Sequence, residues 1–346
     1  MENYGQYIRE ARCARNISQR EMARRLGIAP ANACRLEQGG SVPTLRTLER
    51  VADALGISLG ELLSTPIPQR PVEPVPEVKS TDIHLESVVG SHRFSDLTPS
   101  SRTAVLKREA EYVRLERKLG IPSATMVQLV HPYDPTRGGA ELAARYVRSS
   151  CDAGTSTLAD LSSLLEFRNI RIHFTHLPSQ VQSLVFFDRD RRTFSILLRS
   201  DDTPERHTYR LAYELGTACL FASSGYRCLK AKGQVHRFAR DFAAAFLMPA
   251  EAVRAAVAQT GLTAERWNFK SLLALKTRFN VSAEAFALRL EDLDLISQGL
   301  RRQFRDQLHA YYEAHPDAME PSPCLKPLVR YSRLEIMQSA DGVVDK

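Results

Sequence analysis

The sequence has few of the residues from which disulfide frameworks, thiolate metal sites and membrane spans are built. Its six cysteines are scattered over 346 residues, and none forms a Cys-x-x-Cys pair, which argues against a disulfide framework or a thiolate zinc site. No run approaches the roughly 18 apolar residues of a membrane span, and the first residues lack a signal-peptide pattern. We therefore expect a cytoplasmic protein that does not associate with membranes.

Histidine is missing where the chain most nearly approaches a catalytic motif, the segment Leu-Ala-Tyr-Glu-Leu-Gly-Thr at 211–217. Histidines at positions 213 and 217 would complete the helical zinc-peptidase motif, in which two imidazoles four residues apart bind one ion and the Glu acts as base. The chain has Tyr213 and Thr217 instead, and a phenol or hydroxyl would have to lose its proton to replace an imidazole. Glu214 is thus a remnant, and we expect no metal, no cofactor and no catalytic residue.

The composition is ordinary for a globular protein, with 43% hydrophobic and 25% charged residues. The net charge of +7 favours a polyanionic partner only weakly, because charge needs a binding motif beside it. Five prolines in residues 66–76 predict an extended spacer rather than a helix. We therefore predict a domain at 1–65, a Pro-rich linker at 66–80, a second domain at 81–295, and a C-terminal helix with a polar tail at 296–346.

The first 65 residues read as five short helices around one apolar core. Ser18 is a good N-cap for the second helix, with Glu21 at the capping-box position. Apolar residues between Met22 and Leu55 fall at helical spacing and would make one compact core. The expected helices are Tyr7–Arg15, Gln19–Leu26, Pro30–Leu36, Thr44–Leu55 and Leu59–Leu63.

This domain resembles the XRE/phage-repressor family of helix-turn-helix domains over residues 4–64. The resemblance is carried by Ile17-Ser18-Gln19, Leu26-Gly27-Ile28 and Arg35-Leu36-Glu37-Gln38-Gly39. It implies that the third helix enters the major groove of double-stranded operator DNA, with its first side chains at the base edges.

On that resemblance Ala31, Asn32 and Arg35 face the bases, where Asn suits adenine and Arg suits guanine. Gln19, at the start of its helix, would anchor a phosphate. The domain has nine Arg, no Lys and seven acidic residues, a net charge of only +2. We therefore expect modest non-specific affinity and a homodimer on the operator. The alternative is a five-helix module used for protein contact.

The second domain reads as mainly helical with a small antiparallel sheet, so the chain as a whole is of the α+β class. Alternating or apolar runs at Ile170–Phe174, Ser183–Phe187 and Thr193–Leu198 predict the strands, and 188–192 the turn between the last two. The expected helices are Arg102–Leu119, Ala140–Cys151, Leu158–Phe167, one from Pro204 through Thr217, Phe238–Leu247, 250–258, 263–267, 269–278 and 282–291.

Residues 100–295 resemble the ImmA/IrrE family of metallopeptidases, a zincin-like fold. The resemblance is carried by Arg206–Gly216, Phe242–Pro249 and Phe279–Ser282 with Arg289-Leu290. The family's third zinc ligand, a Glu, has no counterpart in His236–Asp241. The site therefore departs from the family at both histidines and at this glutamate.

Two interpretations of the vacated site remain open. In the first, Tyr213, Glu214, Thr217 and His236 line a polar pocket for an effector or a partner's segment. In the second, Glu214 pairs with Arg210 one turn back. His236 and His207 are the histidines that could join Glu214 in a non-standard metal site.

The combination predicts a transcriptional regulator of the kind found in bacterial stress-response and mobile-element systems, with a pseudopeptidase domain that senses a ligand or partner or mediates dimerisation. The alternatives are a metallopeptidase with a non-standard metal site that cleaves a repressor or itself, and an autoregulating antitoxin or immunity-type protein.

Overall fold

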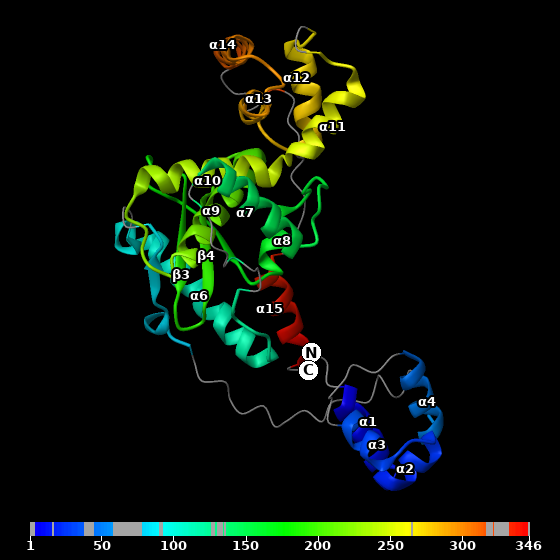
Figure 1. The fold of residues 1–346 in the computed structure, drawn as a ribbon. Helices are drawn as coiled ribbons and strands as arrows, with labels where there is room; N and C mark the ends of the chain where they lie inside the picture. Colours follow the sequence, from blue (N-terminus) through cyan, green and yellow to red (C-terminus); the bar gives the residue numbers. More distant parts are fainter. Residues whose placement is uncertain are drawn as a thin grey trace. The chain divides into compact units, whose positions relative to one another are not determined.

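The computed structural model describes residues 4–15, 17–37, 45–57, 78–89, 93–125, 129, 134, 136–263, 266–315, 321 and 332–344. The chain divides into two compact units, residues 1–74 and 75–346, which are treated separately as the head and the body. The described head is helical, and the body combines helices with one sheet (Figure 1). The predicted α+β class is therefore confirmed. The predicted helix at 59–63 and most of the predicted linker at 66–80 lie outside the described residues.

The head contains four described helices around one core, close to the predicted ranges. They begin where the sequence supplies a start signal: the Ser18 hydroxyl accepts from the amide of Glu21 at 3.1 Å and caps the second helix. Gly27 ends that helix at φ 65°, in the left-handed region that glycine adopts without strain. The helices are α1 (Tyr4–Ala14), α2 (Gln19–Leu26), α3 (Pro30–Glu37) and α4 (Leu45–Leu55).

A buried carboxylate ties three of these helices together. Glu37, at the end of α3, accepts from the Arg12 guanidinium of α1 at 2.7 Å and from the Gln19 amide of α2 at 3.0 Å. Gly5 of α1 lies so close to α3 that an added Cβ would meet the Glu37 carbonyl oxygen at 2.5 Å. The relative placement of α2 and α3 is therefore set by polar contacts as well as by the apolar core.

The body's sheet has four strands in the order β1-β3-β4-β2. The strands are β1 (Leu85–Ser87), β2 (Arg171–Thr175), β3 (Ser183–Asp188) and β4 (Thr193–Arg199). β3 and β4 are antiparallel as predicted, but β2 pairs with β4 in parallel, so the prediction of a purely antiparallel sheet is wrong. The reason lies in β4, whose residues Thr193–Leu198 are all buried. Such a central strand needs neighbours on both edges, and β2 supplies the second.

The faces of the sheet are covered by different helices. The apolar core contains side chains of β2, β3 and β4 together with those of α9 (Pro204–Ser223) and α10 (Lys232–Leu247). The other helices of this half are α6 (Pro99–Leu119), α7 (Arg137–Ser150) and α8 (Leu161–Glu166), with short 3-10 turns at Ser80–Asp82 and Phe94–Asp96. The core of the body is thus built around α9, the helix that carries the segment 211–217.

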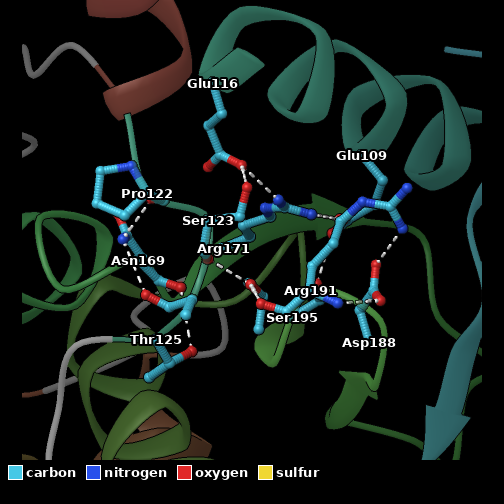
Figure 2. Close-up of polar contacts among 12 residues, drawn as sticks. Glu109, Glu116, Pro122, Ser123, Thr125, Asn169, Arg171, Asp188, Arg191 and Ser195 are labelled. Atoms are coloured by element: carbon cyan, nitrogen blue, oxygen red, sulfur yellow. Dashed lines mark hydrogen bonds and ion pairs between the residues drawn. The ribbon is translucent and has the colours of Figure 1, made fainter. Parts of the chain in front are cut away.

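Helix α6 is fastened to the sheet by buried ion pairs (Figure 2). Arg171 of β2 pairs with Glu109 and, at 2.8 Å, with Glu116. Glu109 also accepts from the hydroxyl of Ser195 on β4 at 2.5 Å and contacts the His173 ring at 2.7 Å. These side chains are almost wholly buried, which is tolerated because their charges compensate one another.

The remaining helices follow α10 along the chain. The helix predicted at 263–267 is absent at its described residues, where Thr263, Arg266 and Trp267 are not helical. The described C-terminal part also contains a helix that the sequence did not reveal, α15. None of the described helices combines the length and the apolar character that crossing a membrane requires. The helices are α11 (Ala250–Thr260), α12 (Phe269–Lys276), α13 (Ala283–Asp292), α14 (Gln298–Ala314) and α15 (Arg333–Val344).

Candidate functional site

The head presents α3 as a surface helix behind the tight turn at Gly27. Pro30 occupies its first position, where a missing N–H costs nothing. Ala31, Asn32 and Arg35, the residues expected to read bases, are all exposed on this helix, whereas Ala33 is buried in the core. The helix therefore has one face fixed by packing and another free for an external contact.

Gln19 is half-buried rather than free. Its side-chain amide donates to Glu37 at 3.0 Å, which uses one of its two N–H groups. The Arg12 guanidinium donates to the same carboxylate, and this hydrogen bond raises the pKa of Arg12 further above its ordinary value. A phosphate contact by Gln19 stays a prediction; it would use the second N–H or the backbone amide.

In the body, the structure brings together the four residues expected at the vacated site. Tyr213, Glu214, Thr217 and His236 line one cavity of about 210 Å³ between α9, α10 and β3. Residues 213 and 217 lie one turn apart on α9, so both face the cavity, as the i, i+4 spacing predicts. His236 reaches it from the first half of α10.

Glu214 is the buried acid of this cavity, with 5% of its surface exposed. Its Oε1 accepts a hydrogen bond from the Ser183 hydroxyl of β3 at 2.6 Å. Burial raises the pKa of Glu214 to about 7, although Ser183 and the positive charge of Arg210 oppose the rise. The described residues contain no ion pair between Glu214 and Arg210, so the interpretation of a simple helix-surface pair is wrong. The partner is Ser183.

Tyr213 and His236 form a second polar pair at the mouth of the cavity. The Tyr213 hydroxyl and His236 Nδ1 lie 2.9 Å apart, at hydrogen-bonding distance. Burial raises the pKa of Tyr213 above its ordinary value, and the neighbouring Glu214 adds to the rise. The phenol is therefore held neutral. The Thr217 hydroxyl donates to the Tyr213 carbonyl oxygen at 3.2 Å, one turn back on the same helix.

These contacts do not fit a zinc site of the peptidase type. Such a site needs two imidazoles and a carboxylate aimed at one ion, whereas Tyr213 is protonated and Thr217 is hydrogen-bonded within its own helix. No three His, Cys, Asp or Glu side chains gather to hold a metal anywhere in the described part of the chain. His207 is also engaged, donating through Nε2 to the Arg199 carbonyl oxygen at 2.8 Å.

The sequence did not reveal Ser183 or Lys232 as residues of this cavity, although both line it. Ser183 shares a strand face with Val185 and Phe187, so period-2 alternation could have placed it toward α9. The short β1 covers only Phe186–Asp188 of β3. On that edge no described strand pairs with Ser183–Val185, which line the cavity.

The position of α9 against α10 depends on Gly216. A Cβ at this residue would meet the Phe242 ring of α10 at 2.9 Å, so the two helices approach as closely as a glycine allows. This close approach sets how near α9 lies to α10, the helix that carries His236.

Comparison with known families agrees with both halves of this description. Residues 8–62 match the family model for a helix-turn-helix, and residues 166–291 match the model for the IrrE N-terminal-like domain of M78 peptidases. No curated protein matches the chain. The predicted fusion is confirmed: the chain joins an XRE-type helix-turn-helix domain to an IrrE/ImmA-like domain of the M78 peptidase family.

Proposed function

We propose that this protein is a cytoplasmic, sequence-specific transcriptional regulator that binds its operator as a homodimer and uses the body as a non-catalytic sensor. The observation that carries the proposal is the cavity of the body. Positions 213, 217, 236 and 214 of the cavity hold a protonated phenol, a hydroxyl, an imidazole and a buried carboxyl. Hydrogen bonds join these groups to one another or to Ser183. The head supplies the DNA contact, and the body supplies a site for a regulating molecule.

In the head, the exposed residues of α3 support direct base reading. Arg35 offers the fork of donors that matches a guanine edge, and Asn32 offers the donor and acceptor pair that matches adenine. The adjoining face of α3 is held by the Glu37 contacts with Arg12 and Gln19, so the recognition helix is presented on a rigid support. Two heads on two half-sites would compensate for the low charge of one head.

The DNA proposal is tested by selecting duplexes from a random library with the full chain, then measuring affinity by fluorescence anisotropy at several salt concentrations. Asn32→Ala with Arg35→Ala should lose at least about 30-fold in affinity for the selected duplex, since each of the two bidentate base contacts is worth about 1–3 kcal/mol and a loss of about 2 kcal/mol is about 30-fold. Arg9→Ala, an exposed arginine on α1, is the matched control. Unchanged affinity and selectivity in the double variant would refute base reading by α3.

In the body, the cavity favours a small polar group rather than a large apolar ligand. Its volume of about 210 Å³ lies below the roughly 300–1,000 Å³ of typical drug-sized pockets. Only one oxygen of Glu214 is occupied by Ser183 among the described residues, so the other can meet a hydrogen-bonding group of a ligand. Lys232 and His236 add basic groups to its wall. A small molecule or one side chain of a partner's segment fits these dimensions.

A metallopeptidase with a non-standard site is distinguished by metal content. Protein purified without chelators should contain zinc well below one ion per chain. Stoichiometric zinc that disappears in Glu214→Gln or His236→Ala would overturn the sensor proposal and restore a catalytic role. Native mass spectrometry of the same preparation would reveal any small molecule retained in the cavity.

A further inference from the structure

The last described helix, α15, lies along α6 rather than extending as a polar tail (Figure 1). Leu334 and Met337 are only 5% and 4% exposed and share an apolar cluster with Tyr112 and Leu115 of α6. Ile336, on the same helix, is 45% exposed and stays outside the contact. Among the side chains of α15 that the structure describes, Leu334 and Met337 therefore make the apolar contact with α6.

Arg333, a charged residue of α15, enters the interior beside these apolar contacts. Arg333 Nη1 donates to Glu116 Oε1 at 2.8 Å, in an ion pair whose side chains are 8% and 1% exposed. Its guanidinium also lies over the Tyr112 ring, 5.9 Å from the centroid. Its other terminal nitrogen, Nη2, is buried without a hydrogen-bond partner in the described structure. Arg333 thus adds one strong contact and leaves one donor unsatisfied.

Glu116 does not depend on Arg333 for its place in the fold. Its second oxygen, Oε2, accepts from Arg171 of β2 at 2.8 Å and from the Ser123 hydroxyl at 2.6 Å (Figure 2). If α15 left, Glu116 would keep both of these partners, and α6 would remain fastened to the sheet through Glu109. The contact between α6 and the sheet can therefore outlast the contact between α6 and α15.

Helix α15 itself is weak. A helix of 12 residues is marginal in water when it stands alone. Its start is capped, because Ser332 and Glu335 exchange hydrogen bonds at 2.7 and 3.3 Å. Its first turn holds Arg333, which the helix dipole disfavours, together with Glu335, which the dipole favours. The helix also contains Gly342, which lowers helix stability further. Docking on α6 and formation of α15 are consequently one coupled equilibrium.

We propose that α15 is a releasable latch on α6. It is held in place by the ion pair of Arg333 with Glu116 and by the apolar contacts of Leu334 and Met337 with α6. Release melts α15 and uncovers Tyr112 and Leu115 beside a buried acid. The rest of the body stays folded, because the ion pairs between α6 and β2 and the apolar core around α9 and α10 do not involve α15. The proposal is independent of DNA binding and of the chemistry of the cavity.

The latch is tested by hydrogen exchange with mass spectrometry on the full chain. In Arg333→Ala, the amides of residues 334–344 should exchange at least about tenfold faster than in the wild type, while those of α9 and α10 keep their protection. Met337→Ala should accelerate the same amides through loss of the apolar contact. Arg333→Lys, which keeps the charge, should lie between the wild type and Arg333→Ala.

Ile336→Ala is the matched control, since it truncates an exposed side chain on the same helix and should leave exchange close to that of the wild type. Two results would overturn the proposal. Unchanged exchange of α15 in both Arg333→Ala and Met337→Ala would show that these contacts do not hold it. Loss of protection in α9 and α10 together with α15 would show that α15 belongs to the cooperative core and cannot be released.

Discussion

Replacing Glu214 with Gln tests how the cavity holds its carboxyl group. In the folded protein, burial raises the pKa of Glu214 from 4.5 to about 7, against the opposing effects of Ser183 and Arg210. In the unfolded chain the same group loses its proton near its ordinary value. Gln has nearly the same shape, its carbonyl oxygen can accept the Ser183 hydrogen bond, and it does not ionise. The substitution therefore isolates the cost of the charge.

The sign follows from proton binding. Between pH 4.5 and 7 the folded state retains a proton that the unfolded state has lost, so the stability of the wild type falls as the pH rises. A pKa difference of about 2.5 at 1.36 kcal/mol per unit gives a loss of about 3 kcal/mol. Glu214→Gln escapes this loss. It should be more stable than the wild type by about 3 kcal/mol at pH 8 and close to it at pH 4.5.

The assay is urea unfolding at both pH values, followed by tryptophan fluorescence. Trp267 is the chain's one tryptophan and is buried in the body, so its emission reports on that unit without a contribution from the head. Glu313→Gln, which removes an exposed carboxylate of α14, should show little of this pH dependence. A Glu214→Gln variant that is less stable than the wild type at pH 8, or a stability difference that does not change with pH, would refute the reasoning.

Two further substitutions test what holds the body together, each read by the same unfolding assay. Arg171→Met removes the cation shared by two buried glutamates of α6 and should lower the free energy of unfolding by about 3–5 kcal/mol at pH 7. Arg189→Met, at an exposed ion pair, should have little effect. Equal losses of stability in the two variants would contradict the buried network. Gly216→Ala drives a methyl group into Phe242 and should destabilise the body by up to about 2 kcal/mol. The same change at Gly233, where a methyl group would meet open space, should stabilise the body by up to about 1 kcal/mol. A gain in stability at both glycines would show that α9 and α10 are not in close contact.

Local signals in the sequence predicted most of the helices. Ser18, Gly27 and Pro30 mark the ends of helices through hydrogen bonding and backbone preference, which act within one turn. The predicted α2 therefore agrees with the observed helix at both ends. The start of α9 was equally readable, because Thr203 caps it and Pro204 opens it.

The errors concern contacts between distant segments. The three-residue β1 is too short to produce an alternating pattern, and the parallel pairing of β2 with β4 depends on which strand fills the second edge of β4. Docking of α15 depends on Glu116, which lies more than 200 residues earlier in the chain. No local pattern around Arg333 could show that it would meet a buried acid.

The candidate cavity was predictable in part, because local helical spacing places some of its residues. Helical spacing alone brings residues 213 and 217 to one face of α9, and the family resemblance adds His236 from α10. The partner of Glu214 was predictable only as far as the strand face: alternation places Ser183 on the face of Val185 and Phe187, but the residue of α9 that it meets depends on how α9 packs on the sheet. Local rules place side chains within an element, and tertiary packing decides what they meet.

The geometry of the cavity has a source other than metal binding. Helices α9 and α10 are held together by a continuous apolar core and by the close approach of Gly216 to Phe242. Of the side chains at 213, 214, 217 and 236, only Tyr213 packs against this core. The types of residue that face the cavity could therefore change without loss of the fold, since the free energy that maintains the helix crossing comes from the core. A peptidase-like scaffold of this construction can keep its pocket while the chemistry inside the pocket is replaced.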